Sequence, residues 1–104
     1  MSAGRIRELN DQLRRTFLGG KVVTTKGIDA LPRDVKVGVM LKIAWFSEFS
    51  AENDPHGEHD FGSVEVDGHK VFWKIDLYED PEVKGADGQS AATRVLTIML
   101  AEEW

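Results

Sequence analysis

The dipeptide Asp67-Gly68 constrains the fold of this chain more than any other feature, because it separates two runs in which apolar and polar residues alternate. The runs are Phe61–Val66 and His69–Tyr78. An Asp-Gly pair between such runs is typical of a β-hairpin with a two-residue type I′ turn. This turn fixes the register, so Gly62 is expected opposite Trp73. The core face is expected to hold apolar residues of both strands: Val64, Val71, Trp73, Ile75 and Leu77.

Two further segments have the apolar spacing of helices. Residues 5–17 predict an amphipathic helix that ends at Gly19-Gly20, with its arginines (Arg5, Arg7, Arg14 and Arg15) on a solvated surface. A second helix is expected from Pro32 to about Phe46 or Phe49. It is apolar on several sides, which predicts burial on more than one side; the residues that widen its apolar stripe are Val37, Met40, Leu41, Ala44 and Trp45.

The rest of the chain completes an α+β pattern. A β-branched run at residues 21–25 predicts a short strand, and Arg94–Leu100 predicts a buried strand, with a helix as the open alternative. Residues 79–92 have no periodicity and many turn formers, so we expect a long mobile loop. The predicted fold is a single α+β domain over residues 1–104 with the order α-β-α-β-β-β, in which two helices pack on one face of a mostly antiparallel sheet.

Charge and cysteine content exclude several classes of function. Residues 1–50 carry a net charge of +4 and residues 51–104 a net charge of −9, which gives −5 overall. A negative chain is a poor candidate for direct nucleic-acid binding, which depends on neutralising phosphates. The absence of cysteine excludes disulfides, thiol catalysis and cysteine-ligated zinc. No apolar stretch approaches the ~20 residues that span a bilayer, and the N-terminal residues do not resemble a signal peptide, so a cytoplasmic protein is expected.

The segment Asn53–Gly62 concentrates residues that bind metals or form turns. His56 and His59 flank Glu58 at a spacing of three residues, and imidazole and carboxylate groups suit divalent transition metals. The known helical zinc motif differs, because the glycine and proline here oppose a helix. These three residues are the metal-site candidates, and no other cofactor is expected.

The same segment permits a catalytic and a structural interpretation. If strand pairing continues past Phe61, His59 lies opposite Asp76, which could orient the imidazole as a general base with Tyr78 nearby. In the structural alternative, His59 only hydrogen-bonds Asp76, and Asp54 binds backbone N–H groups of a turn. Both alternatives stay open at the level of sequence.

An acidic contact surface is the remaining candidate site. Its expected partner is another protein, for which a basic nucleic-acid-binding protein is one candidate, since opposite charges favour association. The oligomeric state is not predicted. The candidate binding residues are all carboxylates: Asp54, Glu58, Asp60, Asp76, Glu79, Asp80 and Glu82.

Three segments carry a resemblance to a known family: Asn53–Gly62, Phe72–Tyr78 and Thr93–Trp104. Together they resemble a family of small bacterial proteins of unknown function, members of which are often encoded on plasmids and other mobile elements. That setting implies an accessory role, such as inhibition of a host defence in the manner of an anti-CRISPR protein. We therefore expect a small acidic protein-binding module. A metal-dependent or His–Asp hydrolytic enzyme with its site in residues 53–62, and a structural subunit of a larger assembly, are the alternatives.

Overall fold

The predicted hairpin organises the sheet. The computed structural model describes the backbone of residues 2–84 and 90–104, and the side chains of these residues except 80–84 and 90–91. In this structure, strand β2 (Phe61–Val66) pairs antiparallel with β3 (His69–Lys84). Asp67 and Gly68 have φ angles of 51° and 81°, as a type I′ turn requires. Gly62 lies opposite Trp73, so the predicted register is confirmed.

Two more strands complete a four-stranded mixed sheet with the order β1-β4-β3-β2. Strand β4 (Ser90–Leu100) runs antiparallel to β3, and β1 (Lys21–Thr24) runs parallel to β4. The segment from Arg94 onward is therefore a strand, and the helical alternative is wrong. A short 3-10 helix, η1 (Ala101–Glu103), follows it.

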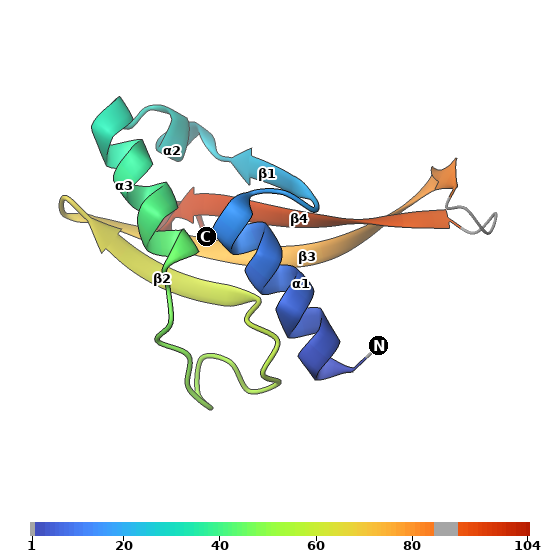
Figure 1. Ribbon diagram of the computed structural model, residues 1–104. Coiled ribbons are helices and arrows are strands. Elements are labelled where there is room, and N and C mark those ends of the chain that lie inside the picture. Colours follow the sequence, from blue (N-terminus) through green and yellow to red (C-terminus); the bar gives the residue numbers. More distant parts are fainter. Residues whose placement is uncertain (1, 85–89) are drawn as a thin grey trace.

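The helices α1 (Ala3–Thr16) and α3 (Arg33–Ala44) lie on the same face of the sheet (Figure 1). This arrangement confirms the predicted α+β fold. The structure adds one short helix, α2 (Lys26–Asp29), to the predicted order. Four residues are too few to show a helical period in the sequence, which is why this helix was missed.

The predicted loop at residues 79–92 is wrong at both of its ends. Strand β3 continues to Lys84, β4 begins at Ser90, and the ladder pairs Glu79 with Ala92. Figure 1 shows this β3–β4 ribbon extending beyond the two helices. A ribbon with no helix against it needs no alternation of apolar residues, so its sequence resembles a loop. The rest of the predicted loop, residues 85–89, lies outside the described residues.

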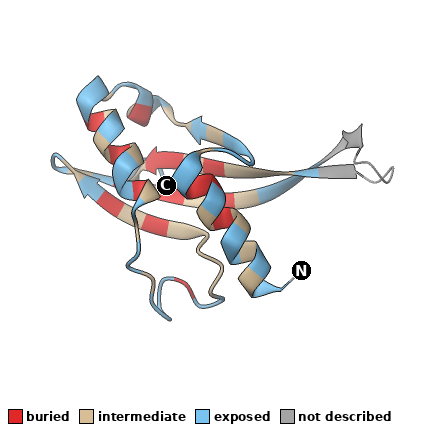
Figure 2. Cartoon of the chain, viewed as in Figure 1, coloured by how far each residue is buried: buried red, intermediate tan, exposed pale blue. Residues whose placement is uncertain are grey.

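The core lies between the sheet and the two large helices (Figure 2). Trp73 is fully buried, whereas Leu77, also predicted in the core, is 58% exposed because it lies on the extended ribbon. The buried cluster draws on every layer and contains Leu13, Ile28, Val39, Ile43, Val64, Val71, Trp73, Ile75, Leu96 and Ile98. Within the described residues, no helix is both long and apolar enough to cross a membrane.

Within residues 2–84 and 90–104, no large helix covers the opposite face of the sheet. There η1 returns the chain so that the ring of Trp104 lies 5.5 Å from that of Phe61 and 5.6 Å from that of Phe72, edge to face. Glu103 holds this turn in place by accepting bonds from the hydroxyl of Thr25 and the backbone N–H of Gly27. Trp104 nevertheless remains 68% exposed.

Gly62 is the position in the hairpin where a side chain is least tolerable. A Cβ atom there would lie 2.5 Å from Nε1 of Trp73. We expect Gly62→Ala to lower the free energy of unfolding by about 1–3 kcal/mol, because the buried indole has to shift. Urea denaturation measures this loss. Ser63→Ala on the next residue is the control, and an equal loss in both variants would contradict the proposed packing.

Candidate functional site

The segment between α3 and β2 is organised by the side chain of Asp54. Asp54 is 8% exposed, and its carboxylate accepts hydrogen bonds from the backbone N–H groups of Glu58, at 3.1 Å, and His59, at 3.2 Å. Asn53 accepts a further bond from the N–H of Ser50, at 2.8 Å. This is the turn that the structural interpretation predicted. Asp54 is therefore occupied internally, contrary to its prediction as a contact residue.

His59 faces helix α1 rather than strand β3. Its ring stacks on Phe49 with centroids 3.7 Å apart, and Nδ1 donates to Oδ1 of Asp11 across 2.9 Å. The predicted pairing of His59 with Asp76 is wrong. His59 has a φ of 53°, which turns the chain before the strand begins, so the ladder starts only at Phe61.

Arg14 ties this segment to the end of α3. Its side chain is fully buried, so the prediction that it is solvated is wrong. One guanidinium nitrogen donates to the carbonyls of Ile43, at 2.9 Å, and Phe46, at 2.7 Å, and the other donates to Asp11 at 2.7 Å. The last carbonyls of a helix have no partner within the helix and carry partial negative charge. Arg14 therefore supplies donors where α3 ends.

Asp11 is the shared acceptor of this cluster. Burial alone would raise the pKa of Asp11, but the hydrogen bonds from Arg14 and His59 lower it more, so the pKa lies below its usual value. The carboxylate therefore stays ionised and compensates the buried guanidinium. We name Asp11, Arg14, Asp54 and His59 the polar cluster. Arg14 and His59 both bond to Asp11, and Asp54 bonds to the backbone of its own turn, which makes the cluster a structural feature of the fold.

The other predicted catalytic and metal-binding residues do not join this cluster. Asp76 is 3.2 Å from Lys74, and Tyr78 is half exposed on the face of the sheet without large helices, beside Lys74 and Trp104. His56 is exposed to solvent. Among the side chains that the structure describes, no group of three or more His, Cys, Asp or Glu residues is placed to hold a metal ion.

The predicted acidic residues occupy different surroundings. Glu58, Asp60 and Asp76 line a hollow of about 210 Å³ together with Arg94, whose Nε donates to Asn10 at 2.6 Å. Burial, and then the charge of Arg5, lower the pKa of Arg94. Glu79 is exposed, and the side chains of Asp80 and Glu82 lie outside the described residues. Three of the predicted acidic residues thus share a hollow with a cation of the chain itself, and the described acidic side chains do not form one uniform negative patch.

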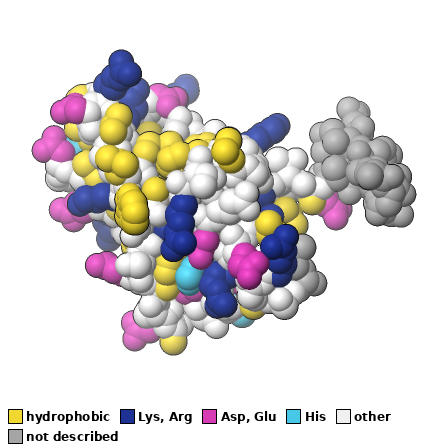
Figure 3. Space-filling model, in the orientation of Figure 1, with side chains coloured by type: hydrophobic (Ala, Val, Ile, Leu, Met, Phe, Trp, Pro, Cys, Tyr) yellow, Lys and Arg dark blue, Asp and Glu magenta, His cyan; other side chains and the backbone are white. Residues whose placement is uncertain are grey.

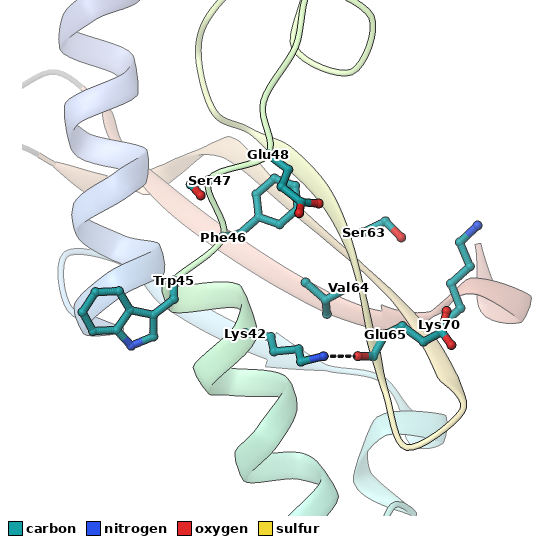
Figure 4. Close-up of a pocket in the computed structure, with 9 residues that line it drawn as sticks. All are labelled: Lys42, Trp45, Phe46, Ser47, Glu48, Ser63, Val64, Glu65 and Lys70. Carbon is teal, nitrogen blue, oxygen red and sulfur yellow. Dashed lines mark hydrogen bonds between the residues drawn. The ribbon is translucent and has the colours of Figure 1, made fainter.

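A second hollow is a groove between the end of α3 and strand β2, and sequence reasoning missed it. Its volume is about 510 Å³. Figure 4 shows the side chain of Lys42 reaching across it to donate to the carbonyl of Glu65, at 2.6 Å, while the Trp45 ring points away from β2. The groove is lined by residues of both sides: Lys42, Trp45, Phe46, Ser47, Glu48, Ser63, Val64, Glu65 and Lys70.

Helix α3 also exposes apolar side chains on its outer face. Val37 is 50% exposed, Leu41 56% and Trp45 82%, and a spacing of four residues places them on one stripe. The prediction that this helix is buried on more than one side is therefore wrong within the described chain. Figure 3 shows hydrophobic side chains gathered over α3. We call Val37, Leu41 and Trp45 the α3 stripe.

Arg14→Met tests the role of the buried guanidinium. The change removes one of the two donors to Asp11 and the donor to the carbonyls of Ile43 and Phe46. We expect a loss of about 3–5 kcal/mol in the free energy of unfolding, because breaking a buried ion pair leaves an uncompensated charge. Urea denaturation measures it. Arg15→Met, at the exposed neighbour, should stay within about 0.5 kcal/mol, and similar losses in both variants would refute this role.

The lowered pKa of Asp11 also predicts how the free energy of unfolding depends on pH. A carboxyl group whose pKa is lowered in the folded state stabilises that state above its unfolded pKa of about 3.9, and the contribution is lost as pH falls through the folded pKa. We expect Asp11→Asn to be much less stable than wild type near pH 7 and the gap to close below about pH 4. Urea denaturation across this range measures it.

The matched control for this pH series is Glu8→Gln. Glu8 forms an exposed ion pair with Arg5, so its replacement should produce only a small difference from wild type. A gap for Asp11→Asn that stays constant down to low pH would contradict the assigned role of Asp11.

Comparison with known proteins identifies a family, but it does not identify an activity. The model of the family described as "Protein of unknown function (DUF3768)" matches residues 24–103, so α1 and its Arg14 precede the matched region. No curated protein and no solved structure matches the chain. Because the family match covers more than half of the chain, this chain belongs to the DUF3768 family of proteins of unknown function.

Proposed function

We propose that this protein is a binding module for another protein and that it docks through the α3 stripe. The observation that carries the proposal is the exposure of Val37, Leu41 and Trp45 on one side of a single helix. Scattered exposed apolar residues are common on soluble proteins, but a contiguous apolar patch marks an interaction surface. Tryptophan is also enriched among the residues that dominate binding energy.

The shape of the stripe indicates the kind of partner. Val37 and Trp45 are eight residues apart, which corresponds to about 12 Å along a helix. A narrow ridge of this length fits the apolar face of a helix from the partner, packed along α3. Exposed charges of both signs border the stripe, among them Arg33, Asp34 and Lys42, and they supply the polar rim that such interfaces have.

The net charge of −5 supports a basic partner, such as a nucleic-acid-binding protein, through long-range attraction. Inhibition of a host defence belongs to the same proposal, because such an inhibitor acts by binding one protein. The exposed Trp45 and Trp104 also support a second candidate, a permanent subunit of a larger assembly. The two differ in whether the protein can be purified free of its partner.

Site-specific photo-crosslinking in the native host tests the proposal. A photoreactive phenylalanine analogue at position 41 should give a crosslink to one other protein, identified by mass spectrometry. The control places the same analogue at Gln12, which is exposed on α1, and this position should give no crosslink. Crosslinks at both positions, at neither, or at position 41 only to a second copy of the chain would count against this function.

Binding to the partner so identified should then depend on the stripe. Leu41→Glu is expected to weaken binding by about thirtyfold, the effect of losing a residue that contributes about 2 kcal/mol. Titration calorimetry with the purified partner measures the change. Gln12→Glu adds the same charge on α1, and an equal loss for that variant would show that charge rather than the apolar stripe is responsible.

A further inference from the structure

The outer edge of strand β2 is a second surface that could take a partner; it adjoins the α3 stripe only at Trp45, which also lines the groove beside the edge. In the described sheet β2 is the last strand, and it pairs only with β3. Its six residues keep one register without a bulge and contain no proline. An exposed edge strand that has neither a β-bulge nor a proline can pair with a further strand. The other edge strand, β1, has only four residues.

The hairpin geometry identifies which backbone groups face outward. In a hairpin with a two-residue turn, the residues that flank the turn, here Val66 and His69, exchange hydrogen bonds, and the bonded pairs then alternate along the strand. The bond from Lys42 to the carbonyl of Glu65 comes from outside the sheet, as this alternation requires. The residues whose N–H and C=O groups point away from β3 are therefore Phe61, Ser63 and Glu65.

We propose that β2 of a second copy of this chain pairs antiparallel with this edge, about a two-fold axis through Ser63. One register uses all the outward-facing residues: Ser63 opposite the Ser63 of the second copy, and Phe61 opposite its Glu65. This register forms three bonded pairs and joins the two sheets into one of eight strands. Because the axis is perpendicular to the sheet, the helices of both copies lie on the same face.

The charges of the edge are compatible with a second copy. In this register Glu65 faces a phenylalanine, so no like charges lie directly opposite each other, which would be destabilising. The groove beside the edge is lined by Lys42, Lys70, Glu48 and Glu65, two charges of each sign. The chain as a whole is negative, but at this groove it does not repel a copy of itself.

The groove also has room for the added strand. Its volume of about 510 Å³ lies between α3 and the free edge, on the side where the second β2 would enter. Lys42 occupies only one of the two lone pairs of the Glu65 carbonyl, so this oxygen can still accept a bond from the second copy. The inference uses β2 and the groove, and it does not depend on the proposed docking at α3.

Charged residues introduced at Ser63, on the proposed two-fold axis, test the pairing. Sedimentation velocity from low micromolar to sub-millimolar concentration should show wild type in a monomer–dimer equilibrium. Ser63→Lys places two lysines opposite each other and should raise the dimer dissociation constant about tenfold or more, as should Ser63→Glu with two carboxylates. An equimolar mixture of the two variants should recover the dimer. A monomeric wild type, or a mixture that stays monomeric, would overturn the proposal.

A second measurement covers the case in which charged variants at this half-buried position fail to fold. The chain has no cysteine, so Ser63→Cys introduces a single thiol. Bonded antiparallel pairs have Cα atoms about 5.5 Å apart, within the range of a disulfide. With copper–phenanthroline as oxidant, Ser63→Cys should form a linked dimer much faster than Tyr78→Cys, an exposed position on the inner strand β3. Equal rates would overturn the proposal.

One further variant separates this inference from the proposed function. Leu41→Glu should leave the sedimentation of the dimer unchanged, because Leu41 does not line the groove. If Leu41→Glu abolishes the dimer and Ser63→Lys does not, the two copies associate through α3, and pairing at β2 is overturned.

Discussion

The buried guanidinium of Arg14 is the interaction on which the arrangement of this protein depends. It is fully enclosed, and it bonds to carbonyls at the end of α3 and to the carboxylate of Asp11. Its carbon centre also lies 5.3 Å from the ring centre of Phe49 and 5.4 Å from that of Trp73. A buried charge is tolerated only when it is paired and hydrogen-bonded. The positions of α1, α3 and the segment after α3 are therefore coupled through one side chain.

This coupling explains why the histidine-rich segment does not form an evident catalytic or metal site. Asp11 is shared between Arg14 and His59, and Asp54 is used by the backbone N–H groups of its own turn. Asp11, Asp54 and His59 thus already have partners that stabilise the fold, whereas His56 is exposed to solvent. The two surfaces that we propose for recognition, the outer side of α3 and the edge of β2, lie outside the polar cluster.

The sequence predicted the features that depend on local chemistry. The Asp-Gly turn determined the register of β2 and β3. The Asp54 turn was predictable because aspartate side chains often accept hydrogen bonds from nearby backbone N–H groups. Contacts between distant segments were not predictable. Asp11 and His59 are forty-eight residues apart, and nothing in the spacing of Arg14 distinguishes it from its exposed neighbour Arg15. The extended β3–β4 ribbon was missed because strand pairing without burial leaves no apolar alternation.

The two-layer architecture leaves this chain with more apolar surface than it can cover. Large helices cover one face of the sheet, and on the other face only a 3-10 turn folds Trp104 onto Phe61 and Phe72. Helix α3 is apolar on both its inner and its outer sides, although only the inner side meets the sheet. Covering the outer side requires a further layer, and the described chain provides none. Since removing apolar surface from water drives association as it drives folding, this exposed side of α3 supports our proposal that another molecule packs against it.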